Sequence, residues 1–494
     1  MKNKLDMKEF FYKYLVNSFI YLEILCSVFL YVLVILNIPT QNGDNIEHIH
    51  STFMVANGDV PYRDFFQHHN PLLWFIFAPL VKIFAYDTTV AEILLFISFL
   101  VFLKSLVYVY NITKEFLADK FWATVAVLLV IVPTYKIFAI DFRPDNYMVF
   151  ALMAGIYYYF SYLRDKKTQQ LVVSFIWFVL AFLFAQKALF PLFVLGLSGL
   201  YFWYKKEIKT SDLIKSLIAP IIMIGGCFAY LAYYKIVKLY FVSNFTFNLN
   251  LVEGFEMGRF AKMYGLLIFS IVGAVLGAGC AIGSKNRYWR ILALLFIVEF
   301  LQRKYYFSPY IYYYWLLMYV AVLTFIPLLK IIDESTRLVR VVVVGICLFF
   351  LYNGVMFHLN NILNTKQGHE GYLPYFITKR ITPCDYVFNG NGLMYNIFGK
   401  DPHYYWQLIG QLDVVGEKTG IAPKPNINKI IFELKPKFIY GKSYFNKFAD
   451  ESGRKEIVHY IDKDLLDRYY KPAPFSGIYE LKEEYWRECN IKKL

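Results

Sequence analysis

The sequence predicts a polytopic α-helical membrane protein with a long first extracytoplasmic loop and a small soluble α/β domain at its C-terminus. Hydrophobic residues make up 58% of the 494 residues and charged residues only 18%, whereas soluble proteins are usually about 45–50% apolar. Apolar runs that approach the roughly 20 residues of a membrane span recur from the N-terminus to residue 358. These observations exclude a disordered chain, a disulfide scaffold, a coiled coil and an ordinary soluble enzyme.

About eleven spans are expected. The first is Asn17–Asn37, and the others follow at 90–110, 121–140, 147–163, 169–185, 188–204, 214–236, 263–283, 289–301, 309–329 and 339–358. The run Pro71–Tyr86 is shorter and contains Lys82. We predict that it is a partly inserted or interfacial helix, because counting it as a span would move every later loop to the other side of the membrane.

Lys and Arg residues indicate the orientation. If the lysine-rich N-terminus is cytoplasmic, every second loop should be basic. The basic residues of these loops are Lys114 and Lys120; Arg164, Lys166 and Lys167; Lys205, Lys206, Lys209 and Lys215; Lys285, Arg287 and Arg290; and Lys330, Arg337 and Arg340. The loops 38–89, 141–146, 186–187, 237–262 and 302–308 and the tail after residue 359 are then extracytoplasmic.

The net charge of +14 does not indicate nucleic acid as a partner. Lys and Arg are scattered between the apolar runs, and no basic stripe with interleaved aromatic residues occurs in the sequence. Basic residues that anchor cytoplasmic loops explain the excess of positive charge.

Residues 360–494 are predicted to form a separate domain after a transmembrane module at 1–359. In the tail, Ile430–Tyr440 indicates the end of a helix, a Lys-Pro turn and a strand, and Asp385–Phe388 and Gly477–Leu481 indicate further strands. An external compartment permits a disulfide between the two tail cysteines, Cys384 and Cys489.

Two carboxylates in the first external loop are candidates for acid–base chemistry. Asp44 and Glu47 are three residues apart, so on a helix they would share one face. Asp44 also precedes a helical pattern, so capping that helix is an alternative role.

The same loop contains His48, His50, His68 and His69, four of the eight histidines. Zinc needs three or four converging ligands. His48 and His50 would diverge on a helix, and the adjacent His68 and His69 are expected to point apart. The sequence therefore predicts solvated or hydrogen-bonded histidines and no metal site.

This loop resembles the polyprenyl-phosphate-dependent glycosyltransferases of the GT-C superfamily, and within it the protein O-mannosyltransferases and the lipid A aminoarabinose transferases. In that family the acidic pair is adjacent and a Lys often precedes the proline; here Asn45 follows Asp44, and two histidines and Asn70 precede Pro71. The resemblance covers the topology of roughly residues 10–360, and it implies substrate-binding roles for Tyr62, Asp64, His68 and His69. The matching residues are Asp44, Glu47, Gly58, Pro61, Tyr62, Asp64, Asn70, Pro71 and Leu72.

A second element of the resemblance is Asp141-Phe142-Arg143-Pro144-Asp145 in the short second external loop. The resemblance implies that Arg143 binds a phosphate and that Asp145 orients the acceptor or a cation. A helix that begins with Pro144, with an acidic residue in its first turn and a salt-bridged Arg, is the structural alternative.

Basic residues of two later loops complete the candidate site. A charge such as Lys187 is costly near a membrane unless it is paired or interfacial, so it either neutralises a lipid phosphate or extends to the interface. The resemblance places a basic residue and a Tyr of the late loop against the donor phosphate, which points to Arg303, Lys304 and Tyr313. An aromatic belt would also place Tyr there.

The function implied is transfer of a hexosyl or pentosyl group from a polyprenyl-phosphate donor in the membrane lipid to an extracytoplasmic glycolipid, polysaccharide or protein. Direct displacement would invert the anomeric centre, with Asp44 as base, Glu47 or Asp145 as alternatives, and the cations relieving charge on the leaving phosphate. No cofactor is required, although a divalent cation is compatible with these residues.

The expected location is the cytoplasmic membrane of a bacterium, with the active site and the tail outside. A transporter is the alternative, but no paired broken helices or two-fold hydropathy symmetry occur in the sequence. A non-catalytic lipid-linked assembly partner is a third interpretation.

Overall fold

The computed structural model describes residues 7–37, 43–132, 140–250, 265–302, 314–335, 338–364, 373–389, 396–404, 426–440, 462–475 and 477–486. The chain forms two compact units, each assembled from separated segments. The first comprises Met1–Asn37, Phe96–Gly226 and Val252–Leu363, and the second comprises Ile38–Leu95, Cys227–Leu251 and Asn364–Leu494.

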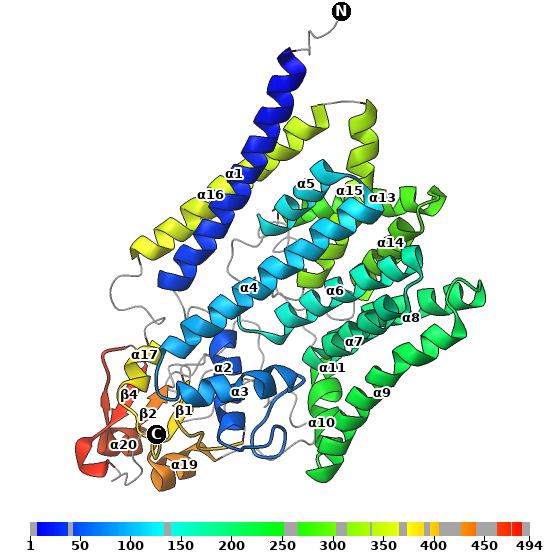
Figure 1. Ribbon diagram of the computed structural model, residues 1–494. Helices are drawn as coiled ribbons and strands as arrows, with labels where there is room; N and C mark the ends of the chain where they lie inside the picture. The colour runs from blue at the N-terminus through cyan, green and yellow to red at the C-terminus, as the bar shows by residue number, and fades with distance from the viewer. Residues whose placement is uncertain are drawn as a thin grey trace, which may run out of the picture. The chain divides into compact units, whose positions relative to one another are not determined.

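Each of the eleven predicted spans contains a described helix (Figure 1). These helices are α1 (Met7–Asn37), α4 (Thr89–Ile112), α5 (Lys120–Ile131), α6 (Pro144–Asp165), α7 (Thr168–Phe184), α8 (Leu189–Tyr204), α9 (Thr210–Tyr233), α13 (Gly265–Gly283), α14 (Arg287–Gln302), α15 (Trp315–Ser335) and α16 (Leu338–Asn364). Within the described residues, six stretches are long and apolar enough to cross a membrane: Asn17–Leu36, Thr89–Leu117, Gln186–Tyr204, Thr210–Tyr233, Trp315–Glu334 and Leu338–Met356. The predicted fold class, a polytopic helical membrane protein with a small sheet, is confirmed.

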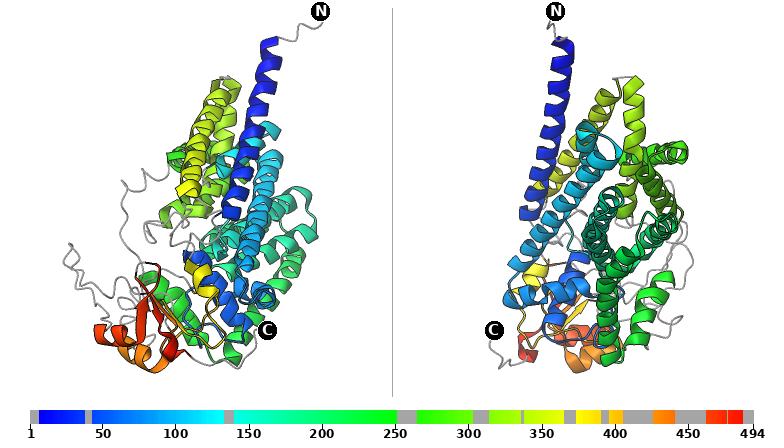
Figure 2. Two further views of the ribbon diagram at one scale, coloured as in Figure 1. Left: turned by 90° about the vertical axis from the view of Figure 1, so that its left-hand side faces the viewer. Right: turned by 45° about the vertical axis from the view of Figure 1, so that its right-hand side comes forward.

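The helices of the first unit lie side by side (Figure 2), and α6 packs along α7. Seventeen of the 22 residues of α6 are buried, as expected of a helix that is apolar nearly all round. Gly155 of α6 lies so close to α7 that an added Cβ would be 2.4 Å from the ring of Phe178. Gly277 of α13 similarly meets the carbonyl oxygen of Thr324 in α15. Small residues let these helix backbones approach closely, as in many membrane helix pairs.

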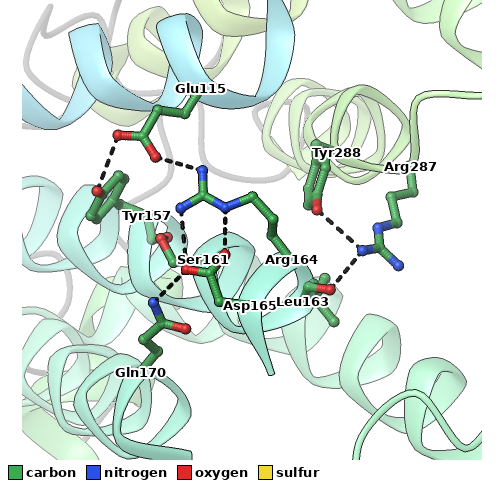
Figure 3. A network of polar contacts seen from close by, with 9 residues as sticks. All are labelled: Glu115, Tyr157, Ser161, Leu163, Arg164, Asp165, Gln170, Arg287 and Tyr288. Carbon is green, nitrogen blue, oxygen red and sulfur yellow. Dashed lines mark hydrogen bonds and ion pairs between the residues drawn. The ribbon is translucent and has the colours of Figure 1, made fainter. Parts of the chain in front are cut away.

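The predicted basic loops meet at one end of this bundle (Figure 3). Arg164 donates at 2.7 Å to Glu115, which lies in the π-helix η1 (Thr113–Leu117) that follows α4. Arg287, the first residue of α14, donates to the carbonyl oxygen of Leu163 at 2.7 Å. The Lys166 amine donates to the carbonyl oxygen of Glu207 at 3.0 Å. These contacts place the loops after α4, α6, α8 and α13 on one side of the unit, as the alternation of charge predicts.

The second unit contains the loop 38–89 that is predicted to be the first external loop, part of the 237–262 loop and the tail. Its helices are α2 (Gly43–Ala56), α3 (Leu72–Ile83), α10 (Val237–Phe241), the π-helix η4 (Val242–Phe247), α11 (Asn248–Asn250), α17 (Leu373–Thr378), α19 (Ile427–Leu434) and α20 (Lys463–Tyr469), with the end of α9 and the start of α4. Helix α3 coincides with the run that was predicted to be a partly inserted or interfacial helix.

The tail forms a four-stranded sheet in the order β1-β2-β4-β3. Its strands are β1 (Val387–Asn389), β2 (Phe438–Tyr440), β3 (Tyr470–Pro472) and β4 (Ile478–Leu481). Strands β1 and β2 are parallel with Phe388 opposite Ile439, and the β2–β4 and β3–β4 pairs are antiparallel. The core between the sheet, α19 and α20 consists of Phe388, Ile431, Ile439, Leu466, Tyr469, Tyr470 and Leu481.

The predicted end of a helix followed by a Lys-Pro turn and a strand is confirmed in the tail. Helix α19 starts at the cap residue Asn426, whose side chain accepts a hydrogen bond from the Lys429 amide. It ends at Lys435, which adopts a left-handed conformation with φ of 41°, and Pro436 then prevents the helix from continuing. Cys384 is disulfide-bonded, whereas its predicted partner Cys489 lies outside the described residues. The domain boundary at 359/360 stays a prediction.

Candidate active site

Helix α2 presents the two carboxylates of the first external loop. The helix spans Gly43–Ala56, so Asp44 lies in its first turn, where the helix dipole favours a negative charge. Asp44 is half-buried, and Glu47, one turn further, is 4% exposed. The predicted helix is confirmed, and its three-residue spacing puts both carboxylates on one face.

The buried side chain of Gln67 holds Glu47 in position. The Gln67 amide nitrogen donates to Glu47 Oε1 at 3.0 Å and to the Ser51 hydroxyl oxygen at 2.8 Å. The Ser51 hydroxyl in turn donates to the Glu47 carbonyl oxygen at 2.8 Å. Gln67 was not among the predicted site residues, although it lies in the same short stretch as the two adjacent histidines.

His68 and His69 lie together, so the expectation that their rings point apart is wrong. Their ring centroids are 4.2 Å apart. The chain bends at His69 rather than continuing as a strand. The Asn248 side chain donates to the His68 carbonyl oxygen at 2.9 Å, and the Tyr62 hydroxyl donates to the His69 carbonyl oxygen. Neighbouring side chains alternate only in a regular strand, and these contacts hold the segment in a different shape.

Glu47, His68 and His69 together could hold a metal ion. Each residue is buried, and each offers one ligand atom within 4.8 Å of the other two. Two imidazoles and a carboxylate suit zinc better than magnesium, which prefers oxygen ligands. Three protein ligands would leave the fourth tetrahedral position for water or a substrate oxygen.

His48 and Trp74 line the same part of the loop. The Trp74 indole N–H donates to His48 Nδ1 at 3.3 Å, and the two rings are stacked. The ring of His48 lies 5.0 Å from that of His69. Because Nδ1 accepts the hydrogen bond from Trp74, His48 is a hydrogen-bonded histidine, as the sequence predicted.

A row of polar side chains from the 237–262 loop supports this segment. The Tyr240 hydroxyl donates to Asn70 Oδ1 at 2.9 Å, and Asn244 donates to the Tyr240 carbonyl oxygen at 3.1 Å. Asn248 continues the row one turn further, where it binds the His68 carbonyl oxygen. These residues were not predicted, although their spacing of four in the sequence was a usable signal for one helix face.

Tyr62 and Asp64, predicted to bind substrate, lie in the turn that leads into the histidine segment. Tyr62 is fully buried and has a φ of 68°. Its ring packs edge-on against that of Tyr240, with ring centroids 5.5 Å apart. Burial raises the pKa of its hydroxyl well above the ordinary value. Asp64 accepts from the Val60 amide at 2.7 Å and pairs with Arg63, and the hydrogen bond from Arg63 lowers the pKa of Asp64.

The second group of predicted residues belongs to the first unit. Arg143 is the residue before α6 and Asp145 lies in its first turn; both are 3% exposed. Lys187 lies in the short helix η3 (Gln186–Ala188), with its Nζ 2.6 Å from Asp145 Oδ1. The carboxylate of Asp145 therefore forms an ion pair with Lys187.

Arg303, Lys304 and Tyr313 lie outside the described residues. The described chain stops at Gln302, one turn after Glu299, which is 1% exposed in α14. Glu299 was not predicted, although a carboxylate in an apolar run is itself a signal of function in a membrane protein.

Comparison with known proteins gives the fold. No family model and no curated protein matches the chain. Among solved structures, it is similar to ArnT from Cupriavidus metallidurans bound to undecaprenyl phosphate, with a TM-score of 0.58 and 11% identity over 83% of this chain and 88% of that one. It is also similar to the archaeal oligosaccharyltransferase AglB from Archaeoglobus fulgidus in complex with an inhibitory peptide and a dolichol-phosphate, with a TM-score of 0.50 and 12% identity over 97% of this chain and 75% of that one.

Proposed function

We propose that this chain, which has the GT-C superfamily fold, is an integral membrane glycosyltransferase that moves a sugar from a polyprenyl phosphate to an extracytoplasmic acceptor. The observation that carries the proposal is the position of Asp44 on α2, one turn from the buried group of Glu47, His68 and His69. The solved structures of similar fold hold undecaprenyl phosphate and dolichol-phosphate, which supports a lipid-phosphate donor.

Asp44 is the proposed base. Its carboxylate takes the proton of the acceptor hydroxyl as that oxygen bonds to the anomeric carbon. The bond between this carbon and the phosphate oxygen breaks, and its electron pair leaves with the polyprenyl phosphate. Attack opposite the leaving group inverts the anomeric centre. Glu47 is less suited to this role than Asp44, because Gln67 and the two histidines already lie around its carboxylate. Asp145 is also less suited than Asp44, because its carboxylate pairs with Lys187.

Cations of the first unit and the late loop are the proposed phosphate ligands. Lys187 would leave Asp145 or bridge it to the phosphate, and the buried Arg143 offers a guanidinium that can bind two phosphate oxygens. Arg303, Lys304 and Tyr313 are proposed for the same purpose. These groups stabilise the leaving phosphate more strongly as its charge develops, which is how they would accelerate transfer.

Tyr62, Asp64, His68 and His69 form the proposed acceptor side of the site. Tyr62 and Asp64 shape the turn, and the two histidines with Glu47 fit a zinc ion. When bound, zinc would supply a positive charge that polarises a substrate oxygen. Contacts with the bound sugar and acceptor would determine which sugar is transferred and whether the acceptor is a glycolipid, a polysaccharide or a protein.

The test is transfer by the purified protein in lipid vesicles, with the donor identified by mass spectrometry of the co-purified lipid. Asp44→Asn should lower turnover at least about 100-fold, the usual scale for a general base, and donor-lipid binding should change little. Asp87→Asn is the matched control, because Asp87 is an exposed carboxylate of the same loop whose Oδ1 accepts from the Thr89 amide. Near-normal transfer by Asp44→Asn would move the base to Glu47 or Asp145. No transfer by the purified wild-type protein would instead favour a non-catalytic assembly partner.

A further inference from the structure

Residues 396–404, which we call the tail clamp, connect the tail sheet to the first external loop within the second unit. On the sheet side, the Val387 amide donates to the Lys400 carbonyl oxygen at 2.9 Å, and the Lys400 amide donates to the Asp385 carbonyl oxygen at 3.0 Å. Gly399 packs so closely on β1 that an added Cβ would lie 2.4 Å from Val387 Cγ2. The clamp is therefore held firmly against β1.

On the other side, the clamp contacts helix α2 through His50. The ring of His50 is completely buried. Its Nδ1 lies 2.9 Å from the Ile397 carbonyl oxygen, and its Nε2 lies 2.7 Å from Asp401 Oδ2. Asn396 donates to the other oxygen of Asp401 at 3.3 Å and to the Gly399 carbonyl oxygen at 2.9 Å, so the carboxylate is oriented by the clamp itself.

Aromatic and backbone contacts extend this interface. The ring of Phe398 packs edge-on against that of Phe53, with centroids 5.1 Å apart. The Phe66 amide donates to the Tyr404 carbonyl oxygen at 2.9 Å, and the Tyr404 hydroxyl donates to the Tyr62 carbonyl oxygen at 2.7 Å. The clamp thus contacts both α2 and the turn that precedes the histidine segment.

The partners of His50 favour its protonated form. A carbonyl oxygen and a carboxylate oxygen only accept hydrogen bonds, so both contacts are satisfied when both ring nitrogens carry protons and the ring is an imidazolium. Burial lowers the pKa of His50, but the charge and hydrogen bond of Asp401 more than offset this, and the net pKa is raised. A buried charge is tolerated only when it is paired, so Asp401 stabilises the cationic ring.

We propose that the tail clamp positions the reactive face of α2, with the His50–Asp401 ion pair as its fixed point. His50 lies one turn after Glu47 and two turns after Asp44 on the same helix, so a displacement at His50 moves both carboxylates. This inference rests on the proposed transferase function, and it makes the tail a working part of the active site. His50 and Asp401 are positioning residues, because they act through α2 rather than on the substrate.

The first experiment compares Asp401→Ala, Asp401→Asn and His50→Ala with wild type in the full-length protein. A misplacement of about 1 Å can cost roughly 100-fold in rate, so Asp401→Ala should lower kcat by about 10- to 100-fold and leave the KM for the donor lipid nearly unchanged. The double variant His50→Ala/Asp401→Ala should be no slower than either single variant, because both remove the same contact. Glu483→Gln is the control, since it alters an exposed ion pair of the same tail, with Lys471 at 3.7 Å.

The second readout is the pH profile of turnover. The charged groups that face His50 are Asp401 and Asp59. A raised folded-state pKa means that the contribution of the ion pair is complete below the ordinary pKa of 6.5 and is lost as pH rises through the folded-state pKa. Asp401→Asn keeps an acceptor oxygen but removes the charge, so the alkaline fall in turnover should shift to lower pH. If the role of Asp401 were purely structural, Asp401→Asn would lower the amount of folded protein without shifting the alkaline fall in turnover.

Amide hydrogen exchange tests the clamp independently of activity. Exchange across α2 should be faster in Asp401→Ala and His50→Ala than in wild type or Glu483→Gln, because helix protection reports local opening. If wild-type protein transfers no sugar while α2 still loses protection in these variants, the proposed function fails and the clamp stands. Unchanged protection of α2 in a folded Asp401→Ala protein, or a wild-type kcat and pH profile for Asp401→Asn, would overturn the clamp.

Discussion

At the scale of single residues, the loop separates two carboxylates that share a helix face. Glu47 is enclosed by Gln67 and two imidazoles, and Asp44 is half-buried at the start of the helix. A carboxylate already surrounded by ligand-type side chains is suited to bind a cation, and a more accessible one is suited to exchange a proton with an acceptor. These different surroundings favour cation binding for Glu47 and proton transfer for Asp44, two roles that the sequence alone did not distinguish.

Zinc binding is the prediction at this scale. We expect the purified protein to bind about one equivalent of zinc, and Glu47→Gln or His69→Ala to lose it, because each removes one of three converging ligands. Gln67→Leu should lower zinc affinity about 10- to 100-fold, since residues that orient a ligand typically contribute that much. Elemental analysis and competition with a chelator measure both effects.

Asp87→Asn is the matched control for zinc binding, because Asp87 is an exposed carboxylate of the same loop outside the group of Glu47, His68 and His69. Equal zinc content in wild type, Glu47→Gln and His69→Ala would show that the converging side chains serve only to hold the loop together.

At the scale of helices and strands, local patterns predicted most of the structure. Continuous apolar runs mark the eleven helices of the spans, and the Lys-Pro pair that ends α19 has a purely local cause. The segment around His68 could not be predicted in this way. Its shape depends on Asn248, 180 residues further along the chain, and on the Tyr62 hydroxyl. The same holds for His50, whose partner Asp401 is 351 residues away, because periodicity contains no information about contacts at such separations.

The Lys187–Asp145 pair joins α6 to the connection between α7 and α8, and it gives a prediction at this scale. Asp145 is buried and Lys187 is partly buried, and removing one partner of a buried ion pair costs up to about 3–5 kcal/mol because the remaining charge loses that counter-ion. Lys187→Met should therefore strongly lower the free energy of unfolding, and Lys187→Met/Asp145→Asn should recover most of it. If Lys187 also binds the donor phosphate, the double variant should remain defective in donor-lipid binding.

Thermal unfolding in detergent and binding of a fluorescent polyprenyl phosphate provide the two readouts for this pair. Lys166→Met is the control, because the side chains of Lys166 and Glu207 are 42% and 36% exposed and lie 3.7 Å apart, and solvent-exposed pairs contribute about 0–1 kcal/mol. Full donor binding by the stable double variant would assign Lys187 a structural role alone.

At the scale of the whole molecule, the arrangement of charge supports the topology on which the function depends. Basic loops that are far apart in sequence are joined by contacts of Arg164 with Glu115 (Figure 3). Glu207 likewise contacts both Lys166 and Arg287. Arg340 extends this set, since its guanidinium lies 4.4 Å from the ring centroid of Phe121. An even number of spans between successive basic loops is the simplest way to bring all of them to one side.

The last prediction is that the tail is extracytoplasmic. Eleven spans after a cytoplasmic N-terminus place residues beyond Leu359 outside, where the disulfide-bonded state of Cys384 is also favoured. Reporter fusions after Leu359 should therefore be active only for a reporter that works outside the cytoplasm, and fusions after Lys206, in a basic loop, should show the opposite behaviour. A cytoplasmic signal after Leu359 with the expected signal at Lys206 would mean that the number of later spans is even. The tail and the first loop would then lie on opposite sides of the membrane, although His50 of α2 contacts Asp401 of the tail clamp directly. That result would therefore contradict the tail clamp together with the predicted topology.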